Sequence, residues 1–137
     1  PIVTEEWGHF RMVFSEINKR KLTLGKQRKD EYVNHLIQNE KKGGSPEDRL
    51  LDQLLLFALI EARSCERFRL LSEQLEDEYL REFYRKFMIS EAGHYKLFLA
   101  LAKEYIDEDK VNTRWKQWLE IEKSILPLLE VRGDRMH

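Results

Sequence analysis

Two Glu-x-x-His motifs, Glu6–His9 and Glu91–His94, combine residue types and spacing that could do chemistry. Residues three apart on a helix are neighbours on its surface, so the carboxylate and the imidazole of each motif can bind one metal ion. Each motif interrupts a row of apolar residues at helical spacing, and Glu61 interrupts a third such row. A carboxylate on a buried face is costly without a partner, and two metal ions shared by the three glutamates would supply one.

The apolar rows that carry these residues predict a helical protein without strands. Apolar residues recur at three- and four-residue steps along most of the chain, which is typical of amphipathic helices. Ser45, Pro46 and Asp48 form a helix start signal, with a capping serine, a proline at the first helical position and an acidic third residue. We expect helices over residues 2–20, from residue 30 to just before residue 43, over 46–72 and 77–105, and after a polar link at 106–110 a last helix that Pro127 bends or ends.

The composition indicates one globular domain, 1–137. The chain has 137 residues, and 24 basic against 25 acidic side chains give it a net charge of −1, which excludes a disordered charged tail. Six glycines and three prolines are too few for an all-β protein. The single cysteine, Cys65, cannot form an internal disulfide and is expected to be a packing residue in a reducing compartment. We expect no leader and no membrane span, and therefore a cytoplasmic protein.

The donor set narrows the choice of metal. Imidazole together with carboxylate suits iron or manganese better than copper, and a structural zinc site would prefer thiolates. A purely structural helical module is the alternative, in which the same glutamates and histidines form a buried polar network with one another or with arginines. The residues favour a dinuclear carboxylate site and leave this alternative open.

Two sequence blocks resemble a known family. The blocks Glu61–Phe68 (EARSCERF) and Ser90–Tyr95 (SEAGHY) closely resemble the bacterial tRNA 2-methylthio-N6-isopentenyladenosine hydroxylases, the MiaE family, and the resemblance extends from Glu6 to about Leu129. It implies an all-α, ferritin-like helical bundle that holds a non-haem di-iron centre. It also implies O2-dependent hydroxylation of the isopentenyl group on a modified adenosine beside the tRNA anticodon, with electrons from a separate donor.

The same resemblance assigns roles to the site residues. Glu6 and Glu91 match glutamates that commonly bridge the two irons, His9 and His94 match one imidazole for each iron, and Glu61 matches a terminal carboxylate. The family pattern has a further glutamate on a helix before the first motif, so we expect the first bundle helix to be missing from this sequence. Two ferrous ions carry four positive charges, whereas these three carboxylates carry only three negative charges. We therefore expect partial metal occupancy.

Several other polar and aromatic residues lie near the predicted site. Glu122 falls on an apolar row of the last helix, and we expect it to form a core ion pair with an arginine rather than to bind metal. Arg63 and Arg67 are expected to pair with carboxylates such as Glu66. Tyr84 and Tyr95 either line the pocket or, as is commoner for aromatic residues at helical spacing, simply pack in the core.

Basic residues in the first half of the chain are the candidate contacts to tRNA phosphates, although a run of charges is also typical of a solvated face. They are Lys19-Arg20-Lys21, Lys26, Arg28-Lys29 and Lys41-Lys42. A ferritin- or rubrerythrin-like iron-binding protein is the alternative function. It would share the bundle and the paired motifs, but it would need neither the EARSCERF block nor an RNA substrate.

Overall fold

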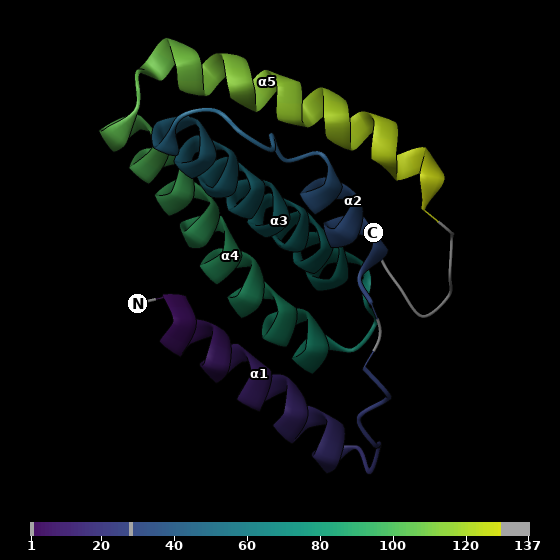
Figure 1. Cartoon of the computed structure of the whole chain (residues 1–137). Helices are drawn as coiled ribbons and strands as arrows, with labels where there is room; N and C mark the ends of the chain where they lie inside the picture. The colour runs from purple at the N-terminus through teal and green to yellow at the C-terminus, as the bar shows by residue number, and fades with distance from the viewer. Residues whose placement is uncertain (1, 28, 130–137) are drawn as a thin grey trace.

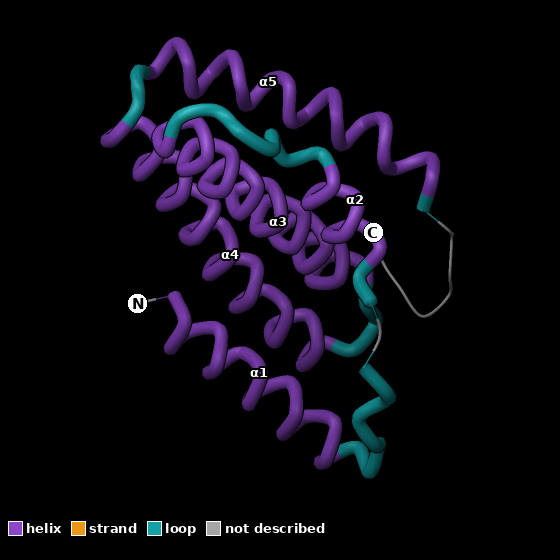
Figure 2. Tube along the Cα trace, in the orientation of Figure 1, coloured by secondary structure: helices purple, strands orange, loops and turns teal. Residues whose placement is uncertain are grey.

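The computed structural model describes residues 2–27 and 29–129. Within these ranges every regular element is helical, which confirms the expected fold class (Figures 1 and 2). The elements are α1 (Ile2–Lys19), α2 (Glu31–Gln38), α3 (Pro46–Gln74), α4 (Glu78–Tyr105), α5 (Glu108–Ile125) and the 3₁₀ turn η1 (Leu126–Leu128). None of the helices in these ranges is long and apolar enough to cross a membrane.

Capping side chains determine where α2 to α5 begin. Before each of these helices, a side-chain oxygen accepts a hydrogen bond from a backbone N–H of the first turn, which contributes about 1 kcal/mol to a helix. Ser45 and Asp48 form the full capping box of α3, with Pro46 at its first position, as the sequence predicted. The other three caps are aspartates: Asp30, Asp77 and Asp107.

Some helix boundaries differ from the prediction. α5 begins directly after Asp107, which caps its first turn, so the link predicted at 106–110 is shorter. α2 ends at Gln38, and the Asn39 backbone N–H closes its last turn by bonding to the Leu36 carbonyl oxygen, three residues back rather than four. α3 continues slightly beyond its predicted end, to Gln74. Pro127 lies in η1, where α5 ends, as predicted.

The main hydrophobic core lies where α3 packs against α2 and α5. Leu55 and Leu59 from α3 meet Leu36 from α2 and Trp118 from α5, and all four side chains are almost completely buried. Burying a side chain of this size contributes about 1.5–3 kcal/mol, so these contacts stabilise the assembly of the three helices. α4 packs lengthwise along α3 and completes the bundle (Figure 1).

α1 runs antiparallel to α4 at the edge of the bundle away from α5 (Figure 1). Glu16 is the only buried residue in the described part of α1, and its carboxylate accepts a hydrogen bond from Tyr79 of α4 (2.9 Å). Large apolar side chains of α1 are exposed: Val3, Trp7, Phe10, Val13 and Phe14. The apolar row that Glu6 and His9 interrupt includes Phe10 and Val13, and the prediction that this row is buried is wrong for these two residues, because α4 covers another face of α1.

Candidate metal centre

α3 and α4 supply one half of the candidate site. Glu91 and His94 lie one turn apart in the middle of α4, and both are buried. Glu61 of α3 reaches the same pair, because its Oε2 lies 3.8 Å from His94 Nδ1 and its carboxyl group is near enough to Glu91 to help raise the pKa of Glu91. The long packing of α3 against α4 holds these three side chains in place.

α1 brings the second motif to the same point. His9 Nδ1 lies 3.5 Å from Glu91 Oε1, and Glu6 Oε1 lies 3.2 Å from His94 Nδ1. Potential ligand atoms of Glu6, Glu91 and His94 all fall within 4.8 Å of one another. The structure therefore brings together all the site residues that the sequence predicted, although Glu6 is exposed rather than buried because α1 covers the site from its outer edge.

The two imidazoles test whether a metal ion fits this cluster. The Nδ1 atoms of His9 and His94 are buried, and neither has a hydrogen-bond partner in the part of the chain that the structure describes. Both atoms nevertheless lie 3.2–3.8 Å from carboxylate oxygens. Buried polar atoms are nearly always satisfied, and a cation between the imidazoles and the carboxylates would bind both. The donor set fits a carboxylate–imidazole iron site.

The carboxylates of the cluster repel one another. Burial, followed by the neighbouring Glu61 and Glu6 carboxyl groups, raises the pKa of Glu91 to about 9. Without a cation, Glu91 therefore keeps a proton at neutral pH. A divalent cation would displace this proton, because it replaces repulsion among the carboxylates with attraction.

Glu5 is a site residue that the sequence analysis missed. Its Oε2 accepts a hydrogen bond from His94 Nε2 (2.9 Å), and this bond lowers the pKa of Glu5. When Nε2 carries the proton, the lone pair of Nδ1 is free and faces the carboxylate cluster. The sequence carried little signal for this role, because an acidic residue beside Glu6 is indistinguishable from one on a solvated face.

Aromatic rings close one side of the cluster. Phe87 packs edge-on against His9 with ring centres 4.8 Å apart, and Phe68 of α3 lies 5.3 Å from Phe87. Tyr84 stacks on Phe68, and Tyr95 packs against Trp115, so both tyrosines make core contacts. The Cys65 thiol donates to the Met88 carbonyl oxygen (3.4 Å), in keeping with its expected packing role.

Glu122 belongs to a separate buried network. It accepts hydrogen bonds from Arg63 Nη2 (2.8 Å) and from the Tyr32 hydroxyl (2.7 Å), which confirms the expected ion pair with an arginine. Arg63 also pairs with Glu66, as predicted. Arg67 donates to the Ser64 hydroxyl and lies over the Phe68 ring.

The structure separates the basic residues that were predicted to contact RNA. Residues 19–21 lie at the C-terminal end of α1, where Arg20 bonds to Glu16 and reaches Asp77 at the start of α4. Residues 41–42 precede α3 at the opposite end of the bundle (Figure 1). Arg28 lies outside the described residues. The described basic residues therefore do not form one continuous patch.

Paired Glu-x-x-His motifs on adjacent antiparallel helices, with a glutamate on a third helix, place the chain in the ferritin-like class of helical proteins. A solved structure of a Synechococcus protein, described as having aldehyde deformylating oxygenase activity, superposes on this chain with a TM-score of 0.86. The two sequences are 33% identical, and the match covers 98% of this chain and 65% of the Synechococcus chain.

Within that class, the chain belongs to the MiaE family. The family model, described as tRNA-(MS[2]IO[6]A)-hydroxylase (MiaE), matches residues 1–137. The chain is 34% identical over 125 residues to the tRNA 2-(methylsulfanyl)-N(6)-isopentenyladenosine(37) hydroxylase of Salmonella typhimurium, covering 91% of the chain and 45% of the relative. It is 50% identical over 60 residues to the Pseudomonas putida protein of the same name, covering 44% of the chain and 29% of the relative. The matched segments thus cover less than half the length of each of these relatives.

Proposed function

We propose that this chain forms the di-iron core of a tRNA hydroxylase. The proposal is carried by the buried Nδ1 atoms of His9 and His94, which lack hydrogen-bond partners among the described residues and face the carboxylates of Glu6, Glu61 and Glu91. In a chain of the MiaE family, these five side chains are the donors that would hold two iron ions.

The proposed substrate is the isopentenyl group of 2-methylthio-N6-isopentenyladenosine beside the tRNA anticodon, in agreement with the names of the relatives. When bound, the irons would supply the O2 chemistry that hydroxylation of an unactivated C–H bond requires. One oxygen atom enters the product and the other becomes water, so the reaction takes two electrons beyond those of the C–H bond. A separate electron donor is therefore part of the proposal, in the cytoplasm where tRNA is found.

The residues of the chain have distinct tasks in this reaction. Glu5 holds the proton on His94 Nε2 and so keeps Nδ1 available as a donor atom. The rings of Phe87 and Phe68 exclude water from one side of the cluster. Glu91 holds a proton while no cation is bound and gives it up when the cation binds.

Nucleoside analysis of tRNA tests the proposed function. A bacterial strain that lacks the gene encoding this chain should accumulate the unhydroxylated prenyl adenosine, and the unmodified gene should restore the hydroxylated form. Glu91→Ala should fail to restore it, because the variant lacks a buried donor of the cluster. Glu104→Ala is the matched control, because Glu104 is an exposed glutamate of the same helix, and this variant should restore hydroxylation fully.

Two outcomes would contradict the proposal. Full hydroxylation in the strain that carries Glu91→Ala would show that the catalytic centre does not lie in this cluster. Unchanged nucleosides in the deletion strain, together with iron binding by the purified chain, would instead favour an iron-binding protein without an RNA substrate.

A further inference from the structure

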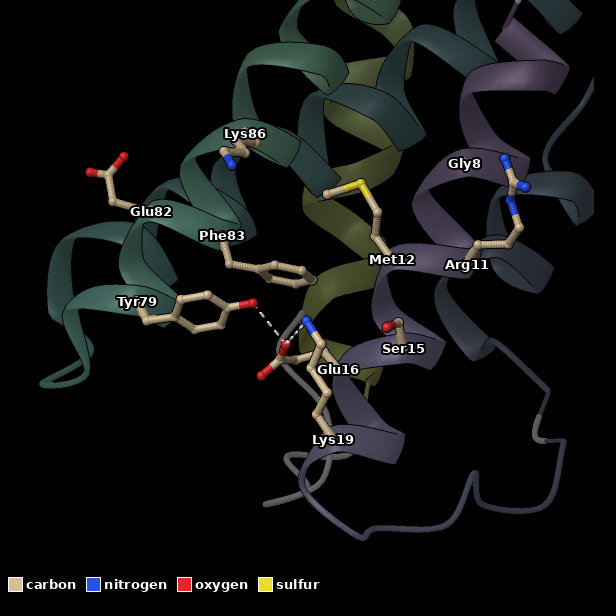
Figure 3. A pocket seen from close by; sticks show the side chains of 10 residues that line it. All are labelled: Gly8, Arg11, Met12, Ser15, Glu16, Lys19, Tyr79, Glu82, Phe83 and Lys86. Carbon is tan, nitrogen blue, oxygen red and sulfur yellow. Dashed lines mark hydrogen bonds and ion pairs between the residues drawn. The ribbon is translucent and has the colours of Figure 1, made fainter.

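A groove of about 570 Å³ lies between α1 and α4, outside the carboxylate cluster (Figure 3). Phe83 of α4 and Met12 of α1 extend into it from the two helices. The Phe83 ring lies 4.9 Å from that of Phe87, which in turn packs on His9 at 4.8 Å. The apolar floor of the groove is therefore continuous with the ring that covers a predicted iron ligand.

The charges that line the groove are unbalanced. Glu16 already accepts hydrogen bonds from Tyr79 (2.9 Å) and Arg20 (2.8 Å), and Lys19 lies 3.8 Å from the same carboxylate. The groove's other acidic residue, Glu82, pairs with Arg85 (3.3 Å), which does not line the groove. Each acidic side chain of the groove is thus paired with an arginine outside the groove, which leaves the positive charge of Lys19 in excess.

Arg11 and Lys86 are the groove's remaining cations, one on each helix, and neither has an acidic partner among the residues that the structure describes. Arg11 and Lys19 are eight residues apart on α1, which at 1.5 Å per residue is about 12 Å along the helix axis. A single phosphate cannot span that distance, whereas an extended polyanion can. Cations along a groove with an aromatic floor are the combination that binds single-stranded nucleic acid, because phosphates pair with the cations and a base stacks on the ring.

We propose that this groove binds the anticodon loop of the RNA substrate, with phosphates at Arg11, Lys19 and Lys86 and a base or ribose on Phe83. This inference rests on the proposed function and adds to it the surface that holds the RNA. An acidic electron-donor protein would use the same cations, but it would have no need of Phe83, a half-buried ring that lines the groove between them.

The test measures RNA binding separately from hydroxylation. The probe is a synthetic anticodon stem–loop that carries 2-methylthio-N6-isopentenyladenosine, titrated with the purified chain by fluorescence anisotropy at several salt concentrations. We expect Arg11→Glu and Lys86→Glu each to weaken binding about tenfold or more and to reduce the salt dependence. Phe83→Leu should weaken binding at every salt concentration, because the leucine keeps the apolar contact but loses the stacking ring.

Lys123→Glu on α5 is the matched control, because it makes the same charge change at an exposed position far from the groove. It should bind RNA within twofold of the unmodified chain, and circular dichroism should show all four variants equally helical. The inference is wrong if the two groove reversals bind RNA as tightly as the control, or if the unmodified chain binds no RNA. If the groove variants bind RNA with unchanged affinity but are no longer reduced by the electron-donor protein, the groove is the docking site of that donor and the inference is overturned.

Failure of the groove and failure of the proposed function are distinguishable. If the chain restores the hydroxylated nucleoside in cells while both reversals bind RNA normally, the function stands and the groove assignment falls. If the unmodified chain restores no hydroxylated nucleoside, the proposed function falls whatever the groove binds.

Discussion

The two halves of the candidate metal centre are held in different ways. Glu91 and His94 of α4 expose only 7% and 5% of their side chains, whereas Glu6 and His9 of α1 expose 46% and 18%. α4 packs along α3 over much of its length, but α1 meets the bundle through one face. The α3–α4 half is therefore preorganised, and the α1 half depends on contacts made across the site itself.

Those cross-site contacts give metal binding a structural consequence. His9 approaches Glu91, and Glu5 and Glu6 approach His94, so much of what attaches α1 to α4 passes through candidate ligands and their partners. A bound cation would join donors from both helices and stabilise α1 against α4.

The largest effect is expected on metal binding. Glu91→Ala removes a buried donor from the preorganised half, and we expect about a 100-fold or greater loss of Co(II) or Fe(II) affinity, more than substitution beside a metal ligand usually costs. Glu6→Ala removes an exposed donor that solvent replaces in part, and we expect about a tenfold loss. Titration of the metal-free chain, followed by Co(II) absorption, measures both, with Glu104→Ala as the control. Equal losses would show that the two halves contribute alike.

The second prediction compares the packing of the two regions. Leu55→Ala opens a cavity in the core between α3, α2 and α5, and should lower the free energy of unfolding by about 2–5 kcal/mol. Trp7→Ser on the exposed face of α1 should change it by no more than about 0.5 kcal/mol, despite the larger side chain removed. Urea denaturation followed by circular dichroism measures both. A large loss for Trp7→Ser would mean that another surface covers this face of α1.

The third prediction concerns Glu5, which acts through His94 rather than on the metal. Glu5→Ala should weaken Co(II) binding about tenfold, because the imidazole loses the acceptor that fixes its proton on Nε2. Glu5→Gln should recover most of the affinity, since its amide oxygen still accepts the bond. Thr4→Ala is the control at an exposed neighbouring position. A proton resonance of His94 Nε2–H that is unchanged in Glu5→Ala would contradict the positioning role.

The sequence predicted the α4 half of the site well, and physical reasons explain why. The i, i+3 spacing of Glu91 and His94 within an apolar row fixes both their mutual position and their burial, because the row faces α3. Glu61 has no such partner and was found only because it interrupts an apolar row. Helix starts were predicted at Ser45, where a cap and a proline coincide, and at Asp30 and Asp77, whereas the start after Asp107 was missed.

The α1 half was harder to predict from sequence. Periodicity shows which face of a helix is apolar, but it does not show whether another element covers that face, and Phe10 and Val13 are exposed although their row predicted burial. The hydrogen bond between Glu5 and His94 depends on how two helices meet. No local sequence pattern predicts how α1 packs against α4. For Glu122, an arginine partner was predicted from the sequence, but only the packing of α5 on α3 identified it as Arg63.

The last prediction compares two buried carboxyl groups, Asp52 of α3 and Glu91 of α4, whose pKa values are shifted in opposite directions. Asp52 pairs with Arg114 of α5, with Oδ2 and Nη2 2.8 Å apart. Burial alone would raise the pKa of Asp52, but hydrogen bonds from Arg114 and from the Lys41 backbone N–H outweigh burial and lower it. The pKa of Glu91 is raised by burial and by its carboxyl neighbours.

These directions fix the sign of the pH dependence. A carboxyl group with a lowered pKa in the fold stabilises it above the unfolded pKa, and that contribution is lost as pH falls through the folded pKa. A carboxyl group with a raised pKa acts in the opposite sense, because the fold binds an extra proton between the unfolded value of 4.5 and the folded value. The metal-free chain should therefore lose the contribution of Glu91 as pH rises through this window.

Urea denaturation of the metal-free chain between about pH 3 and about pH 9 separates the two contributions. We expect Glu91→Gln to be more stable than the unmodified chain at about pH 8, because the amide needs no proton to sit among carboxylates. Asp52→Asn should be less stable at about pH 8 and should lose less stability on acidification, because its stabilising charge is already gone. If Glu91→Gln leaves the profile unchanged, the carboxylates of the α4 half do not repel one another in the metal-free fold. The contrast between a crowded, preorganised half and an open half would then rest on packing alone.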